Sequence, residues 1–80
     1  MRKVKTNMSD IAVRILGGIM DSAAMEKGYR QLTIVERYAR LIEKVNHYQA
    51  DSLLARDFGY TNLNEIEAYL IRCKFEAESR

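Results

Sequence analysis

GYRQLTIVERY at residues 28–38 and GYTNLNEIEAY at residues 59–69 are two similar segments that bracket the middle of this 80-residue chain. In each, a glycine supplies the positive φ at which helices often end. The pairs Thr33–Glu36 and Asn64–Glu67 have the spacing of capping boxes, in which each side chain accepts a hydrogen bond from a backbone amide at the start of a helix. The repeat therefore predicts two tight turns, each followed by a new helix.

The rest of the chain has a helical pattern and contains no proline. Ser9 is placed to cap a first helix that runs to about residue 27, a second helix spans residues 32–59, and a third ends near residue 77. Leu54 would lie on the polar side of a straight second helix. We therefore expect a bend or break near residues 50–51, or a partner that covers Leu54.

This reading gives an all-α fold class: a small three-helix domain with two tight Gly-Tyr turns. The second helix belongs to both of two overlapping helix–turn–helix units. Eighty residues make one domain with a thin core. A composition that is 48% hydrophobic and 30% charged is typical of a folded soluble chain.

Cysteine usage and the start of the chain bear on location. Cys73 is the one cysteine, so it cannot form an internal disulfide, which fits a reducing compartment. No hydrophobic signal segment follows the basic start, and no stretch is long and apolar enough to span a bilayer. The sequence therefore predicts a cytoplasmic protein without a membrane partner.

Positive charge is concentrated at the beginning of the chain. Arg2, Lys3 and Lys5 are three of its thirteen basic residues, and the remaining ten are balanced by eleven acidic ones. Residues 1–8 therefore read as a basic N-terminal arm, and residues 9–80 as the single three-helix domain. The arm suits either a solvated tail or a phosphate-binding segment of the kind that some DNA-binding domains carry.

The first helix is unusually apolar. Arg14 and Asp21 are the only charged residues between positions 11 and 25, and the Gly17-Gly18 pair weakens the helix by roughly 1 kcal/mol per glycine relative to alanine. Such a helix needs apolar neighbours on two sides, one of which is a second copy of the chain. The predicted homo-oligomer interface consists of Ile11, Ile15, Gly18 and Ile19.

Cationic side chains gather on the second helix. Arg37, Arg40 and Lys44 lie opposite its apolar stripe, and Arg30 belongs to the turn before it. This arrangement predicts a nucleic-acid or phosphate site, although a solvated face laced with Glu36 and Glu43 has the same pattern. Together with the arm, the predicted site is Arg2, Lys3, Lys5, Arg30, Arg37, Arg40 and Lys44.

Catalytic and metal-binding signals are weak. His47 is the one histidine, Cys73 the one cysteine, and nothing in the sequence brings them together. No cluster has the ligand spacing of a zinc site, and no glycine-rich phosphate loop is present. We therefore expect no enzyme, no metal site and no cofactor.

Residues 51–75 contain LLARDFGYTNL at positions 53–63, in which the small Ala55 shortly precedes Gly59-Tyr60 and a Thr/Asn-rich turn follows. This pattern resembles the helix-turn-helix unit of AraC-like regulators. The resemblance implies DNA binding, with a close helix crossing at Ala55. Glu65 and Glu67 depart from this expectation, because DNA phosphates would repel them at the start of a recognition helix.

Residues 27–44 begin with KGYRQLT, and residues 61–72 contain TNLN and LIR. These segments resemble the small helical anti-CBASS sponges of phages, which sequester cyclic oligonucleotide signals in oligomeric pockets. The resemblance implies a ligand pocket in which Tyr29 stacks or hydrogen-bonds, Lys44 faces a phosphate and Arg30 assists. This chain lacks about a dozen residues and a tryptophan of that pattern, and it carries an extra N-terminal helix.

These patterns together predict a small non-enzymatic regulatory protein that acts by binding a macromolecular partner. Among the hypotheses specific enough to assign residues, nucleic-acid binding through the helix-turn-helix-like unit is the leading one. A protein-binding inhibitor or adaptor is the alternative, favoured by the exposed apolar residues expected at Tyr60, Ile71 and Phe75. The third reading is a phage-type sponge for a cyclic oligonucleotide.

Overall fold

A computed structural model of the protein describes residues 8–80. Its elements are α1 (Asp10–Ala24), the 3₁₀ turn η1 (Tyr29–Gln31), α2 (Ile34–Ala50), α3 (Ser52–Phe58) and α4 (Tyr60–Glu78). The described part contains no strand, so the predicted all-α class is confirmed. Arg2, Lys3 and Lys5 of the predicted basic arm lie outside the described residues.

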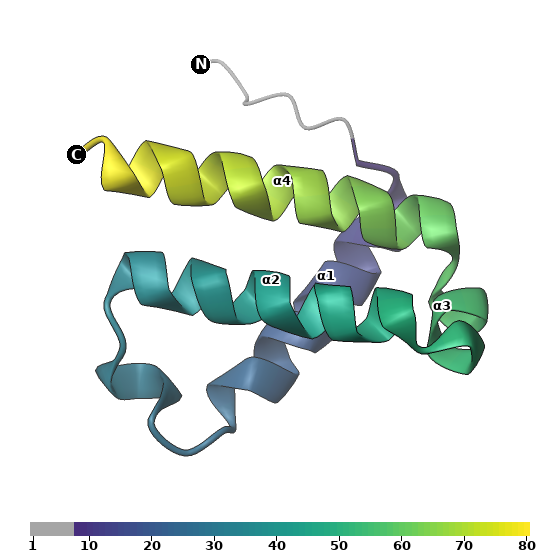
Figure 1. The fold of residues 1–80 in the computed structure, drawn as a ribbon, viewed down its shortest axis with the longest axis horizontal. Helices are drawn as coiled ribbons and strands as arrows, with labels where there is room; N and C mark the ends of the chain where they lie inside the picture. The colour runs from purple at the N-terminus through teal and green to yellow at the C-terminus, as the bar shows by residue number, and fades with distance from the viewer. Residues whose placement is uncertain (1–7) are drawn as a thin grey trace.

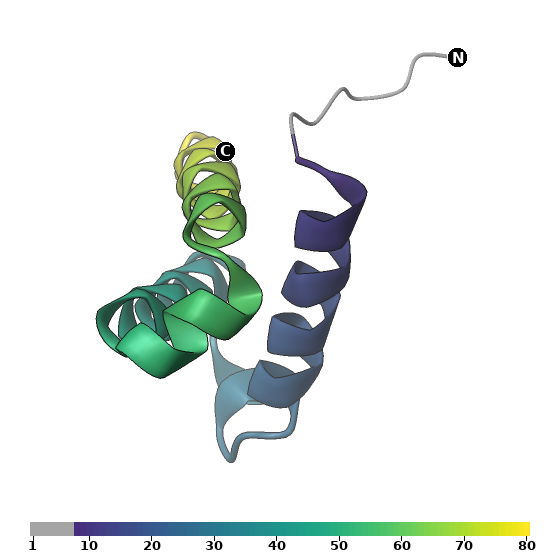
Figure 2. The ribbon, with the colours of Figure 1, turned by 90° about the vertical axis from the view of Figure 1, so that its right-hand side faces the viewer.

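The helices form a thin slab with extents of 36 × 36 × 17 Å. Helices α2 and α4 run antiparallel and side by side, and the short α3 joins them at one end (Figure 1). Helix α1 crosses this pair on one side only, as the view turned by 90° shows (Figure 2). No helix of the described residues lies over the opposite side of the α2–α4 pair.

The core lies where α1 meets the α2–α4 pair. Leu41, Leu63, Ile66 and Leu70 are at most 1% exposed, and burying a side chain of this size stabilises a fold by roughly 1.5–3 kcal/mol. All four helices contribute buried residues. These are Ala12, Leu16, Ile19, Ala23, Leu41, Val45, Ala55, Leu63, Ile66 and Leu70.

Helix α1 begins as the sequence predicts and ends earlier. The Ser9 hydroxyl accepts a hydrogen bond from the Ala12 amide at 3.1 Å, so Ser9 is the N-cap. The Ser9 amide in turn donates to Glu65 Oε1 at 3.2 Å, which ties the start of α1 to α4. The last helical residue is Ala24, and the segment up to residue 27 is a turn.

The first predicted turn is confirmed. Gly28 has a φ of 86°, and η1 follows it directly. The Glu36 amide donates to Thr33 Oγ1 at 3.1 Å, and the Thr33 amide donates to Glu36 Oε1 at 2.8 Å. This reciprocal pair is the predicted capping box at the start of α2.

The second turn is only half as predicted. Gly59 has a φ of 93°, as expected, but α4 begins at Tyr60, so one residue joins α3 to α4. The capping box at Asn64 and Glu67 is therefore wrong. Asn64 lies inside α4 and accepts a hydrogen bond from Gln49 Nε2 of α2 at 3.0 Å. The early start has a physical reason, because it places the buried Leu63 within the helix, where its amide donates to the Gly59 carbonyl at 3.0 Å.

The predicted break in the middle of the chain is confirmed at Asp51. Its Oδ1 accepts hydrogen bonds from the amides of Leu53 and Leu54 at 3.1 and 3.2 Å, so it caps a new helix, α3. The second predicted helix is thus two helices, and four α-helices replace the predicted three. In a straight helix Leu54 would lie on the polar side. Because the break starts a new helix, Leu54 is instead half-buried.

Candidate functional site

The side of the α2–α4 pair opposite α1 carries an apolar groove. It is lined by Ala39, Ile42, Ile71, Lys74 and Phe75, has a volume of about 250 Å³, and is called the α2–α4 groove below. Ile71 is 39% exposed and Phe75 is 63% exposed. Four residues apart on α4, they lie on one side of the helix, beside its buried line through Leu70.

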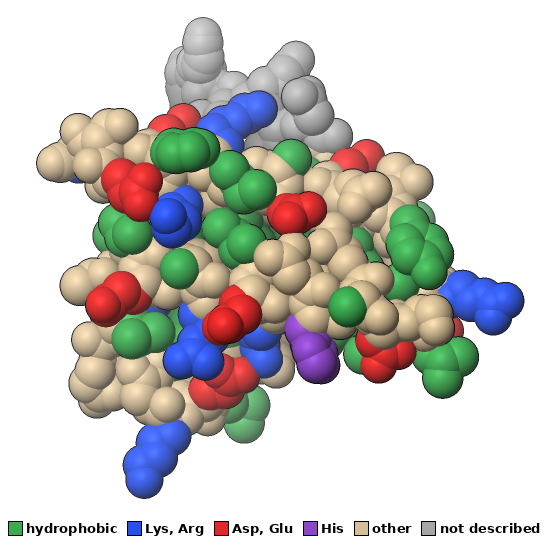
Figure 3. Space-filling model, viewed as in Figure 1, with side chains coloured by type: hydrophobic (Ala, Val, Ile, Leu, Met, Phe, Trp, Pro, Cys, Tyr) green, Lys and Arg blue, Asp and Glu red, His purple; other side chains and the backbone are tan. Residues whose placement is uncertain are grey.

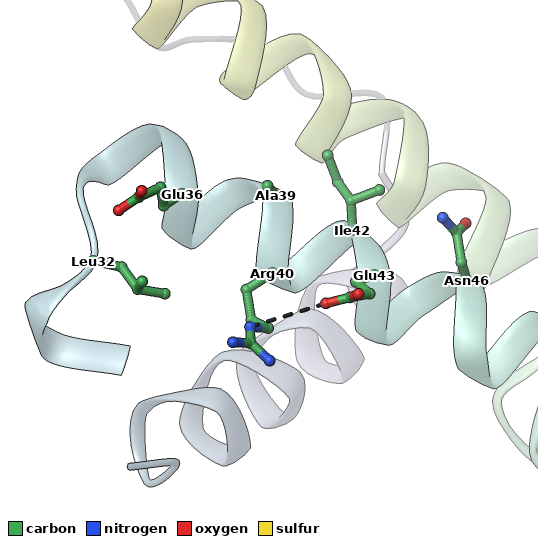
Figure 4. A pocket seen from close by; sticks show the side chains of 7 residues that line it. All are labelled: Leu32, Glu36, Ala39, Arg40, Ile42, Glu43 and Asn46. Carbon is green, nitrogen blue, oxygen red and sulfur yellow. Dashed lines mark ion pairs between the residues drawn. The ribbon is translucent and has the colours of Figure 1, made fainter. Parts of the chain in front are cut away.

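A wider hollow continues the groove along α2. It has a volume of about 540 Å³ and is lined by Leu32, Glu36, Ala39, Arg40, Ile42, Glu43 and Asn46. In Figure 4, Ile42 points toward α4, whereas Arg40 and Glu43 lie on another side of α2 and are joined as an ion pair. Because both hollows share Ala39 and Ile42, they form one continuous surface.

Polar contacts border the groove at both ends. Near α3, Gln49 Nε2 of α2 donates to Asn64 Oδ1 at 3.0 Å and to Glu67 Oε1 at 3.1 Å, both on α4. Near the C-terminal end of α4, Lys74 Nζ donates to Glu78 Oε2 at 2.8 Å. In the space-filling view of this side, apolar side chains lie between charged ones (Figure 3). An apolar centre with a polar rim is the usual anatomy of a protein interface.

Arg37 holds the first turn in place. Its Nη2 donates to the Arg30 carbonyl at 2.8 Å, and its guanidinium lies 5.7 Å from the centre of the Tyr29 ring. Its Nε is buried and has no hydrogen-bond partner among the described residues. Arg37 is therefore bound to the turn, and only part of its guanidinium is left for a ligand.

Two other predicted cationic residues are paired with carboxylates. Lys44 Nζ donates to Glu26 Oε2, and this hydrogen bond lowers the pKa of Glu26 below its ordinary value. Arg40 Nε lies 3.9 Å from Glu43 Oε1 in an exposed pair, which is worth little in water. The side chain of Arg30 is exposed and forms no ion pair within residues 8–80. Arg40 and Lys44 thus line one hollow on α2 together with carboxylates, whereas Arg30 on η1 lines a different hollow and Arg37 is held against the first turn.

The residues of the predicted ligand pocket are not brought together within one chain. Lys44 lines a hollow with Glu26, Arg40, Glu43, His47 and Tyr48, while Arg30 lines another with Ala24, Met25, Glu26, Gly28 and Gln31. Tyr29 lines neither, because its ring lies under Arg37. Glu26 and Glu43 beside Lys44 would also repel a phosphate.

The residues of the predicted oligomer interface are divided between surface and core. Ile11 is 62% exposed, Gly18 is exposed and Ile15 is half-buried. Ile19 is 3% exposed and belongs to the core of its own chain. Its assignment to an interface is therefore wrong, because α1 uses it to pack against the α2–α4 pair.

Cys73 and His47 lie in different surroundings. Cys73 is half-buried next to two tyrosines: a hydrogen bond with its thiol raises the pKa of Tyr69, and burial raises the pKa of Tyr38. His47 is on α2, nine residues after Tyr38, which corresponds to about 13 Å of helix. No group of three or more potential metal ligands occurs among residues 8–80.

Comparison with models of known protein families, with characterised proteins and with solved structures finds no match to this chain. None of the helices in the described part is long and apolar enough to cross a membrane.

The sequence indicated half of the groove. Ile71 and Phe75 stand out as apolar residues beside the core stripe of the last helix. The α2 half was missed, because Ala39 and Ile42 merely broaden the apolar stripe of that helix. The missing information was which side of α2 the first helix covers.

Proposed function

We propose that this chain is a protein-binding module, and that its α2–α4 groove receives an apolar segment of a partner protein. The observation that carries the proposal is the exposed pair Ile71 and Phe75 over a groove that no helix of the described chain covers. Helical partners commonly place one apolar face into a groove of this kind between two helices.

The course of the groove between two helices suits a helical segment. The surface lies between the antiparallel helices α2 and α4 and joins the wider hollow at Ala39 and Ile42. Phe75 provides a large side chain near its end, and aromatic residues often contribute most of the binding energy at such sites. The rim contacts of Gln49 and Lys74 hold polar groups at the border of the apolar centre.

The charge distribution also favours a protein partner. Lys44 is paired with Glu26, Arg40 with Glu43, and much of Arg37 is bound to the turn. Phosphate binding would have to compete with these contacts, whereas an apolar segment in the groove would leave them intact. An inhibitor or adaptor acts in this way, by covering part of another protein.

The test is capture of partners from cells that produce the protein. Phe75→Asp places a charge in the groove and is expected to abolish capture of a protein that the wild-type chain retains. Leu53→Asp is the matched control, because Leu53 is 71% exposed on α3, away from the groove. Equal capture by the wild type and both variants would contradict the proposal.

Nucleic-acid binding is the second candidate. Arg30 and Arg40 are both exposed, and Arg2, Lys3 and Lys5 of the basic arm would add to them. A duplex-DNA gel shift whose affinity falls steeply with salt, and which Arg40→Ala weakens, would favour this candidate. Absence of a shift at low salt would remove it.

A further inference from the structure

Helix α1 has an exposed outer face that the fold of a single chain does not use. It is called the outer α1 face and consists of Ile11, Arg14, Gly17, Gly18 and Asp21, together with Met25, the C-cap residue that directly follows the helix. All are exposed, and they lie opposite the four buried residues of the helix. Figure 2 shows α1 at one side of the α2–α4 pair, with no other helix of the described residues on its far side.

The charges on this face are complementary to those of a second copy. Arg14 and Asp21 are seven residues apart, so about 10.5 Å of helix separates them, too far for an ion pair within one helix. Neither takes part in an ion pair within residues 8–80. Their midpoint falls between Gly17 and Gly18.

An antiparallel pair of α1 helices centred on that midpoint would satisfy both charges. Arg14 of each copy would be level with Asp21 of the other, which makes two identical ion pairs related by a two-fold axis. A parallel pair would instead place like charges opposite each other, at a cost in affinity. The charge pattern therefore selects the antiparallel arrangement.

The glycines lie at the centre of this arrangement. Among residues 8–80, nothing lies within 4 Å of a Cβ atom added to Gly17 or Gly18. The packing of one chain thus gives no reason for two glycines that weaken the helix. The two glycines have a structural reason if they lie at the crossing point of two helices, because the absence of side chains there lets the backbones approach closely.

The apolar residues of the outer α1 face fit the same pairing. Ile11 is 62% exposed and Met25 is 86% exposed. By helical spacing, both lie on the same side of a line drawn along the helix midway between Gly17 and Gly18. In the antiparallel pair, Ile11 of one copy lies beside Met25 of the other, so two exposed apolar side chains are covered at each end.

We propose that two copies of this chain pair through antiparallel α1 helices that cross at Gly17 and Gly18, with Arg14–Asp21 ion pairs on both sides. The outer α1 face and the α2–α4 groove lie on opposite sides of the slab. The pair therefore leaves both grooves open and presents two of them. A partner with two binding segments would gain affinity from this arrangement through effective concentration.

The first test is a charge swap measured by analytical ultracentrifugation over a range of concentrations. The wild type is expected to dimerise, and Arg14→Asp to weaken dimerisation by at least about tenfold. Combining Arg14→Asp with Asp21→Arg restores opposite charges and is expected to recover dimerisation to within about threefold. Arg56→Asp is the matched control, because Arg56 is an exposed arginine on α3.

The second test measures proximity directly. Ile11→Cys and Met25→Cys, each in a Cys73→Ser background, are mixed so that the two thiols lie beside each other in the pair, and mild oxidation is expected to yield a disulfide-linked dimer that contains both variants. Asp57→Cys in the same background, exposed on α3, is expected to form no disulfide crosslink under the same conditions. The proposal is overturned if the wild type is monomeric throughout, if Arg14→Asp leaves the dimer unchanged, or if the double swap does not restore it.

Discussion

The two Gly-Tyr turns have similar sequences and different structures. After Gly28 the chain makes a 3₁₀ turn and then a capping box before α2, whereas after Gly59 it enters α4 at once. Both glycines have positive φ, but their ψ angles are −10° and 122°. Local sequence therefore determines where the chain reverses, and not how the next helix begins.

The difference comes from what each following helix must pack against. In the first turn, the half-buried Leu32 lies before the Thr33 cap and outside α2. In the second turn, the fully buried Leu63 is the fourth residue of α4. Asn62 then uses its amide to donate to the Phe58 carbonyl at 2.8 Å, which closes the corner that the capping box would have closed.

The largest effect is expected from the two glycines. Gly59→Ala should destabilise the protein by about 3 kcal/mol, because its backbone angles are almost restricted to glycine. An added Cβ would also lie 2.9 Å from Asn62 Nδ2. Gly28→Ala should cost about 1 kcal/mol, because Gly28 is in the ordinary left-handed region with no atom near an added Cβ. Urea unfolding measures both, and equal losses would contradict the difference between the turns.

The caps should show a smaller contrast of the same kind. Thr33→Ala removes a capping box and should lower the free energy of unfolding by about 1 kcal/mol. Asn64→Ala removes one exposed hydrogen bond with Gln49 and should cost about 0.5 kcal/mol or less. Thermal and urea unfolding of the two variants provide the comparison. If Asn64→Ala cost as much as Thr33→Ala, the second capping box would exist in solution.

The smallest effect concerns how the first turn is tied to α2. Lys44 lowers the pKa of Glu26, so this pair stabilises the folded state above the ordinary pKa of a glutamate. The stabilisation is lost as the pH falls through the lowered pKa of Glu26. Lys44→Met should therefore raise the pKa of Glu26 toward its ordinary value, as carboxyl NMR titration would measure.

The matched control for this titration is Lys74→Met, which breaks the Lys74–Glu78 pair on α4. It should leave the pKa of Glu26 unchanged. An unchanged pKa in Lys44→Met as well would mean that Glu26 and Lys44 are not paired in solution. The second turn has no counterpart to this titration, because Gln49, which ties α2 to α4 beside it, carries no charge.

The parts of the fold predictable from sequence are those that depend on neighbouring residues. The caps at Ser9 and Thr33, the reversals at Gly28 and Gly59 and the break at Asp51 follow from side-chain and backbone preferences within a few positions. The start of α4 and the burial of Ile19 depend on distant contacts. Periodicity alone does not reveal them, since an apolar arc has the same pattern whichever neighbour covers it.

The same limit applied to the candidate site. Cationic residues on α2 were visible in the sequence, but the partner of Lys44 was not, because Glu26 lies eighteen residues before it. The sequence does not reveal which side of the α2–α4 pair α1 covers. In the fold, the side opposite α1 brings Ile42 and Phe75 together in one apolar groove.

Site-specific photo-crosslinking tests the protein-binding role of the α2–α4 groove most directly. Ile71→p-benzoylphenylalanine places the probe in the groove, and Leu53→p-benzoylphenylalanine places it on exposed α3. On irradiation in cells that produce the protein, position 71 should form a covalent adduct with a distinct protein that position 53 does not form. Identical adducts at both positions, or none at position 71, would contradict the assignment of the groove as the binding surface.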